Sequence, residues 1–152
     1  MDQITIDSIF KRFDESMPQK YVKKILDARI YDLALETPVE KAPLLSQRFN
    51  NNILLKREDL QPVFSFKVRG AYNKLRCLSD AQRSAGVIAA SAGNHAQGLA
   101  LAAKKMNVNA TIVMPVTTPE IKVDAVRSRG ANVVLIGDNY DAAATHANQL
   151  VQ

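Results

Sequence analysis

The stretch Val87-Ile88-Ala89-Ala90-Ser91-Ala92-Gly93-Asn94-His95-Ala96-Gln97-Gly98 decides the fold, because it joins a short apolar run to a helix of small residues. Apolar residues bounded by turn residues predict a buried strand at 87–90. Similar runs at 110–114 and 132–136 place successive strand starts 22 or 23 residues apart, and helical patterns fill the intervals. Alternating strands and helices predict the α/β class, with a wound parallel sheet and helices flanking its faces.

The turn at 91–95 is a candidate ligand site. Backbone N–H groups at the start of a helix lack partners and lie at the positive end of its dipole, which favours an anion. Gly93 would let a ligand approach the backbone, while Ser91 and Asn94 would add side-chain hydrogen bonds. Alternatively, Gly93 serves only the turn, Asn94 caps the helix and His95 is a surface residue. The chain contains neither a Gly-x-Gly-x-x-Gly fingerprint nor a P-loop.

Lys67 is a second candidate, because it stands in the otherwise mainly apolar run Pro62-Val63-Phe64-Ser65-Phe66-Lys67-Val68. A lysine among aromatic and β-branched residues can be desolvated, which lowers the pKa of an amine and makes it nucleophilic. The alternative is a lysine that buries its stem and keeps its ammonium group in water. The local sequence leaves both interpretations open.

The first third of the chain has a different pattern. Apolar residues recur at helical spacing over 1–36, and a turn at 50–52 precedes a strand at 53–57. We interpret 1–60 as part of an incomplete large domain and 61–152 as an α/β small domain. The last helical pattern stops without a cap, so we expect the N-terminal piece of a longer protein, with apolar surface exposed.

Composition excludes several function classes. The net charge of +5 comes from scattered basic residues without interleaved aromatics, so we expect no nucleic-acid partner. No apolar run reaches the roughly 20 residues of a membrane span. The single cysteine, Cys77, excludes an internal disulfide framework and is expected to pack on the apolar face of its helix, and two histidines give no metal-ligand pattern. With no secretory signal pattern at the N-terminus, we expect a cytoplasmic protein.

Three motifs in combination carry a resemblance to a known family. They are Lys-Arg-Glu-Asp at 56–59, Ser-Phe-Lys-Val-Arg-Gly-Ala at 65–71 and Ser-Ala-Gly-Asn-His-Ala-Gln-Gly at 91–98. Together they resemble the fold-type II pyridoxal-phosphate enzymes, and among these they are most similar to the biosynthetic threonine ammonia-lyases. The resemblance runs from about residue 29 to the end. It implies the small domain of that fold plus part of the large one.

The resemblance also implies roles for individual residues. Lys67 would be the catalytic Schiff-base lysine that holds pyridoxal 5'-phosphate, Phe66 would pack against the cofactor ring, and Asn94 would hydrogen-bond the ring hydroxyl. The substrate carboxylate would bind the loop formed by Ser91, Ala92, Gly93, Asn94 and His95.

The reaction that the resemblance implies is β-elimination from L-threonine, and also from L-serine, to a 2-oxo acid and ammonium, which for threonine is the first step of isoleucine synthesis. The family's glycine-rich phosphate loop does not occur in this chain, which has six glycines in all. The isolated chain is therefore expected to have little activity, and the full-length form is expected to be a homo-oligomer, a tetramer by resemblance. Serine racemase, a catabolic serine/threonine dehydratase and a non-catalytic α/β binding module remain alternatives.

Overall fold

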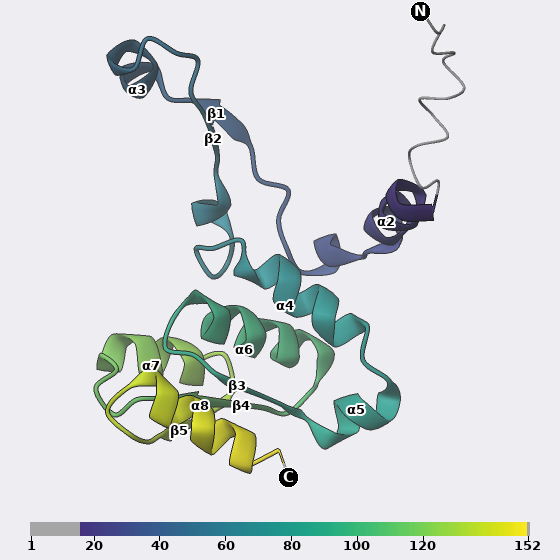
Figure 1. The fold of residues 1–152 in the computed structure, drawn as a ribbon, viewed down its shortest axis with the longest axis vertical. Helices are drawn as coiled ribbons and strands as arrows, with labels where there is room; N and C mark the ends of the chain where they lie inside the picture. The colour runs from purple at the N-terminus through teal and green to yellow at the C-terminus, as the bar shows by residue number, and fades with distance from the viewer. Residues whose placement is uncertain (1–15, 152) are drawn as a thin grey trace, which may run out of the picture.

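A parallel sheet forms the centre of the body of the molecule in the computed structural model, which describes residues 16–151 (Figure 1). Its strands are β3 (Val87–Ala90), β4 (Ala110–Met114) and β5 (Asn132–Leu135), in the order β3-β4-β5. The register pairs Val87 with Ala110 and Thr111 with Asn132. The predicted α/β class is confirmed, whereas the helical pattern expected in 1–15 lies outside the described residues.

Helices cover both faces of this sheet. Side chains alternate along β4, so Ile112 and Met114 pack toward α6 (Asn94–Met106) and α7 (Glu120–Arg127). Val113 points to the other face, where it contacts the alanines of α8 (Tyr140–Gln149). A strand buried on both faces explains why the sequence of β4 is continuously apolar.

Next to α6 lies α4 (Lys67–Arg76), and the two helices share the main core through Ala71, Tyr72 and Leu75 of α4 and Leu99 of α6. The chain then enters α5 (Asp80–Ala85), whose capping box forms as the sequence predicts. The Ser79 hydroxyl accepts from the Gln82 amide, and the Gln82 side chain accepts from the Ser79 amide. Gly86 ends the helix with a φ of +89°.

One local prediction is wrong, and one sequence pattern is misleading. The run Thr118-Pro119-Glu120 is typical of a helix capped by its threonine, but the cap position of α7 is Pro119 and has no side-chain cap hydrogen bond. Cys77 is exposed instead of packed, because it follows the last turn of α4 and lies outside the buried stripe of that helix.

A projecting segment, residues 38–57, is called the arm here (Figure 1). It consists of β1 (Val39–Lys41), α3 (Pro43–Arg48) and β2 (Leu54–Lys56), with β1 and β2 antiparallel. The strand at 53–57 was predicted, but β1 was not, because three residues between Pro38 and Pro43 show no period. All residues of β1 and β2 are exposed, as are Leu44 and Phe49 of the intervening segment.

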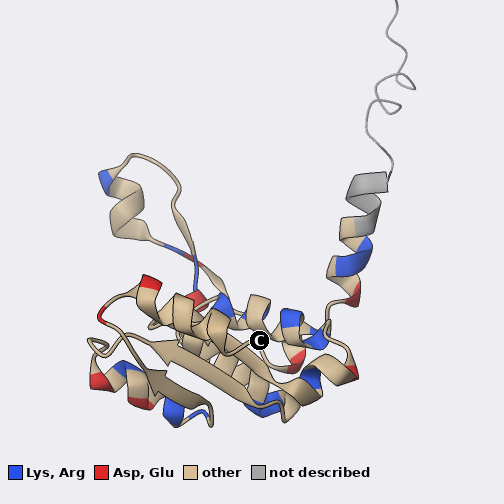
Figure 2. Ribbon diagram, turned by 60° about the horizontal axis from the view of Figure 1, so that its bottom comes forward, with Lys and Arg blue, Asp and Glu red and all other residues tan. Residues whose placement is uncertain are grey.

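The remaining elements precede or follow the arm. They are α2 (Ser16–Asp27), the 3-10 turn η1 (Ile30–Asp32) and the 3-10 turn η2 (Glu58–Leu60). Figure 2 shows lysine and arginine distributed over α2, the arm and the helices of the body. Within 16–151, no helix is both long and apolar enough to cross a membrane.

Candidate active site

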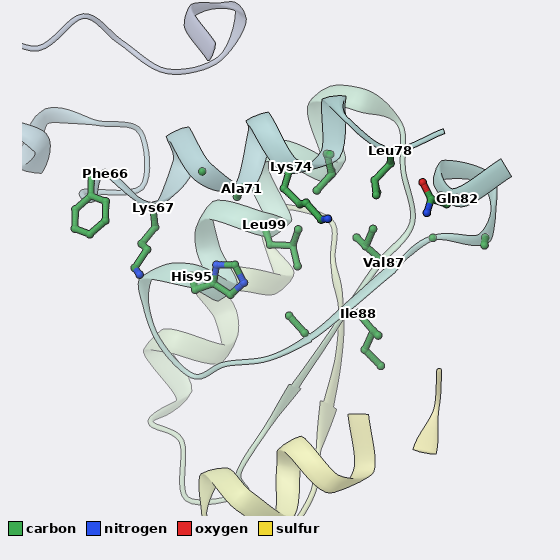
Figure 3. Close-up of a pocket in the computed structure, with 15 residues that line it drawn as sticks. Phe66, Lys67, Ala71, Lys74, Leu78, Gln82, Val87, Ile88, His95 and Leu99 are labelled. Atoms are coloured by element: carbon green, nitrogen blue, oxygen red, sulfur yellow. The ribbon is translucent and has the colours of Figure 1, made fainter. Parts of the chain in front are cut away.

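Lys67 is the first residue of α4, and its side chain extends past the helix end beside Phe66 (Figure 3). Its Nζ lies 5.2 Å from the centroid of the Phe66 ring. Both side chains are exposed, Phe66 by 58%. Of the two interpretations that the local sequence leaves open, the structure has the lysine with its side chain in water. The apolar run turns so that Val63 and Val68 enter the core while Phe64 and Phe66 face outward.

The backbone of Lys67 is placed by a close approach of two helices. A Cβ added to Gly98 in α6 would lie 3.1 Å from the carbonyl carbon of Lys67 and 3.2 Å from the amide nitrogen of Val68. Only glycine lets the two helices come this near without a shift of backbone. The sequence motifs predict no role for Gly98. A glycine inside an alanine-rich helix is the signal that would have indicated it.

The loop at 91–95 connects β3 to α6, and its centre is the Ser91 hydroxyl. Ser91 Oγ accepts from the amides of Gly93 at 3.4 Å and Ala96 at 3.3 Å, so this side chain holds the loop in shape. The alternative that Asn94 caps the helix is wrong. Gly93 occupies the cap position and Asn94 is the first helical residue.

Three amides of this loop remain available to a ligand. Within residues 16–151, the N–H groups of Ala92, Asn94 and His95 have no hydrogen-bond partner. A Cβ at Gly93 would meet nothing within 4 Å, so the space beside the loop is open. Free amides at the start of a 13-residue helix are suited to a carboxylate or another anion.

A groove of about 640 Å³ runs from Lys67 along α4 and over β3 (Figure 3). Its walls are mainly apolar, and its ionisable lining residues are Lys67, Lys74 and His95, with no carboxylate among them. Phe66, Lys67 and His95 lie at the same end of the groove in Figure 3. The other predicted site residues, Ser91, Ala92, Gly93 and Asn94, do not line it, although they belong to the same loop as His95.

A polar cluster, which sequence reasoning missed, lies on the other side of the first turn of α4. Arg69 donates from Nε and Nη2 to the two carboxylate oxygens of Glu58, both at 2.8 Å. Thr37 Oγ1 also donates to Glu58, at 2.6 Å. The Arg69 hydrogen bonds hold the pKa of Glu58 at about 2, well below its ordinary value of 4.5, and the Glu58 carboxylate raises the pKa of Arg69.

Gln61 completes this cluster. Its side chain accepts from the Leu35 amide at 2.9 Å and donates to the Leu35 carbonyl at 2.8 Å, and it is only 1% exposed. Arg69 Nη2 donates to the same carbonyl at 3.0 Å. The cluster of Thr37, Glu58, Gln61 and Arg69 therefore joins the two ends of the arm to α4. Below, it is called the Glu58 cluster.

The site therefore combines an accessible lysine at the start of α4 with free amides at the start of α6, next to a parallel sheet with helices on both faces. The family described as "Pyridoxal-phosphate dependent enzyme" matches residues 30–152, and the chain belongs to this family. The fold and the cofactor predicted from the sequence motifs are thereby confirmed.

Two similar proteins are named as biosynthetic threonine dehydratases. The chain is 56% identical over 130 residues to threonine dehydratase 1 biosynthetic, chloroplastic, of Solanum lycopersicum, which covers 86% of this chain and 22% of that protein. It is also 56% identical over 130 residues to a biosynthetic L-threonine dehydratase of Burkholderia multivorans, covering 84% and 26%. The chain thus spans about a quarter of the length of these relatives or less.

Solved structures of a threonine deaminase and a serine racemase have a similar fold. The processed form of threonine deaminase isoform 2 from Solanum lycopersicum superposes with a TM-score of 0.83 at 55% identity, covering 87% of this chain and 38% of that one. Maize serine racemase has a TM-score of 0.79 at 31% identity, covering 85% and 40%. The similarity to threonine ammonia-lyases predicted from the motifs is therefore confirmed, with serine racemase as a more distant relative.

Lys67, Phe66 and the loop at 91–95 fit the part of a pyridoxal-phosphate site that binds the cofactor through a lysine. Lys67 offers an accessible amine, Phe66 an exposed ring next to it, and the loop at 91–95 offers free amides at a helix start. A planar, anionic aldehyde cofactor matches an apolar groove whose charged lining groups are cationic.

Proposed function

We propose that this chain supplies the lysine-bearing part of a pyridoxal-phosphate-dependent ammonia-lyase that acts on L-threonine and also on L-serine. The observation that carries the proposal is the placement of Lys67 at one end of the groove with His95, the last residue of the free-amide loop. Relatives named as biosynthetic threonine dehydratases support the choice of substrate.

The bound cofactor supplies an electron sink for the carbanion at Cα. Lys67 would hold the cofactor through Nζ, and the same Nζ, when free, would take the Cα proton. The free amides of Ala92, Asn94 and His95 would bind the substrate carboxylate and so orient the Cα–H bond. Asn94 would hydrogen-bond the ring hydroxyl of the cofactor through its side-chain amide, and Phe66 would shield the ring.

The balance of the reaction requires no oxidant. The β-hydroxyl leaves as water after the Cα proton is removed, and a second water molecule replaces the amino group. L-Threonine thus gives 2-oxobutanoate and ammonium, which would open isoleucine synthesis.

The proposal also includes the cellular compartment and the oligomeric state of the protein. An exposed single thiol at Cys77 suits a reducing compartment, and the cytoplasm is the one we propose. We further propose that the protein acts as a homo-oligomer. A catabolic dehydratase or a serine racemase would share the site, and turnover of threonine against serine, with chiral analysis of recovered serine, separates these activities.

The test is chemical trapping. The chain is incubated with pyridoxal phosphate, reduced with borohydride and digested, and the pyridoxyl adduct on each lysine is quantified by mass spectrometry. Lys67 should carry about tenfold more adduct than Lys74, which lines the same groove about two helical turns further on. Lys67→Arg should abolish this excess and leave the Lys74 signal unchanged. Equal labelling of the two lysines in the unmodified chain would contradict the proposed role of Lys67.

A further inference from the structure

We propose that Glu58, Arg69 and Gln61 are positioning residues for Lys67, an inference that rests on the proposed function and adds to it how the lysine is aimed. These residues touch neither the groove nor the loop at 91–95. They act on the first turn of α4 through the Arg69 side chain, two residues from Lys67.

The start of α4 lacks the usual means of holding a helix end. Phe66 occupies the cap position and has no side-chain cap hydrogen bond, and the first turn contains no acidic residue. The Lys67 amide has one long contact, 3.3 Å to Ser65 Oγ. The Arg69 amide donates to the Phe66 carbonyl at 3.0 Å. A helix end without a side-chain cap nevertheless tends to fray. A residue that must hold a cofactor at a fixed angle is poorly served by such an end.

Positive charge in the first turn further destabilises the start of α4. Lys67 and Arg69 are both cations in the first turn, at the positive end of the helix dipole, where cations are unfavourable. Glu58 supplies the missing negative charge from outside the helix. Its carboxylate meets the Arg69 guanidinium in a bidentate pair whose side chains are 17% and 20% exposed. The pair therefore performs the task of an acidic capping residue and adds a fixed direction.

Gln61 connects this pair to the rest of the chain. With both hydrogen bonds to Leu35 in place, residues 35–37 and 58–61 form one support for Arg69. The opposite side of the Lys67 backbone rests on Gly98. Lys67 is thus held between a close helix contact and a charged clamp. Loss of the Glu58 charge would leave Arg69 partly buried and unpaired, and the first turn would be free to tilt.

The experiment compares Glu58→Gln, Arg69→Lys and the control Asp59→Asn in this chain. Asp59 is the neighbouring acid, paired on the surface with Arg57. The first readout is the ratio of pyridoxyl adduct on Lys67 to that on Lys74. Glu58→Gln should lower this ratio about fivefold to tenfold, Arg69→Lys less because the charge remains, and Asp59→Asn not at all. General loosening of the fold would change both lysines alike and leave the ratio unchanged.

The second readout is hydrogen exchange over 62–70 against 71–76, which needs no cofactor. Glu58→Gln and Arg69→Lys should speed exchange in the first segment only. If Lys67 and Lys74 label equally in the unmodified chain while exchange responds as expected, the proposed function fails and the clamp on the helix stands. If Glu58→Gln leaves both readouts unchanged, or speeds exchange in both segments equally, the positioning role is overturned. If Glu58→Gln does not fold, the smaller change Arg69→Lys is read by the same criteria.

Discussion

Two glycines in the neighbouring helices α4 and α6 differ in the space that is available for a side chain. Gly98 faces backbone atoms of Lys67 at 3.1–3.2 Å, whereas Gly70 in α4 has open space where a Cβ would stand. Gly70→Ala should therefore raise the free energy of unfolding by about 0.5–1 kcal/mol, through helix propensity alone.

Gly98→Ala should instead lower the free energy of unfolding by about 1 kcal/mol, because two packed helices must move apart to admit the methyl group. Urea unfolding of both variants checks the pair. A Gly98→Ala variant as stable as Gly70→Ala would show that the helix contact is loose. The same variant should also reduce adduct formation at Lys67, since its backbone rests on Gly98.

At the residue scale, sequence reasoning found the chemistry but not the surroundings. The residue types in the loop at 91–95 indicated a helix start with free amides, and the structure has them. The environment of Lys67 could not be predicted, because it depends on which way Phe64 and Phe66 face after the turn. Phe64 and Phe66 face outward because Val63 and Val68 pack with Ala34, a residue distant from them in sequence.

At the scale of elements, the Glu58 cluster connects η2, α4 and the ends of the arm, and it gives stability a pH dependence. The pKa of Glu58 is about 2 in the folded chain against an ordinary 4.5. Because the folded value is the lower one, the ion pair stabilises the fold fully above pH 4.5. This contribution is lost as the pH falls toward 2.

The unmodified chain should therefore lose about 2 kcal/mol of unfolding free energy between pH 5 and pH 2.5 that Glu58→Gln does not lose; the figure is discounted because the pair retains some solvent contact. Chemical denaturation at several pH values measures the difference between the two proteins. Parallel curves for both would mean that Glu58 titrates alike in the folded and unfolded chains.

Elements with a clear period were predictable, and those held by distant partners were not. Strands β3, β4 and β5 could be read from apolar runs, and α5 from its capping box. Strand β1 could not, since three residues between prolines become a strand only through pairing with β2. The bidentate pair of Glu58 and Arg69 was equally hidden, because its partners lie 11 residues apart in different elements.

For the whole molecule, the arm presents apolar surface to solvent. Leu44 is 80% exposed and Phe49 60%, beside the exposed Leu54 and Leu55. Large apolar side chains exposed on one projecting segment favour association. The chain should sediment as species larger than a monomer at high concentration, and the double variant Leu44→Ser/Phe49→Ser should shift this onset to about tenfold higher concentration.

Ile121→Ser provides the control for that measurement. Ile121 is 79% exposed but stands on α7, away from the arm, so its replacement should leave the sedimentation profile unchanged. An equal effect of both changes would place the association elsewhere than on the arm.

The Glu58 cluster also has a consequence for cleavage of the backbone within the arm. The residues that flank the arm, Thr37 and Glu58, are hydrogen-bonded to each other, and Glu58 pairs with Arg69 of α4. Gln61 holds Leu35 through two hydrogen bonds. The tip at 50–52 is exposed and carries no contact to the lysine. A protease that cut there would produce two polypeptides that remain associated, with the helix of Lys67 still anchored. In this molecule, continuity of the backbone across the tip and integrity of the lysine site are separate properties.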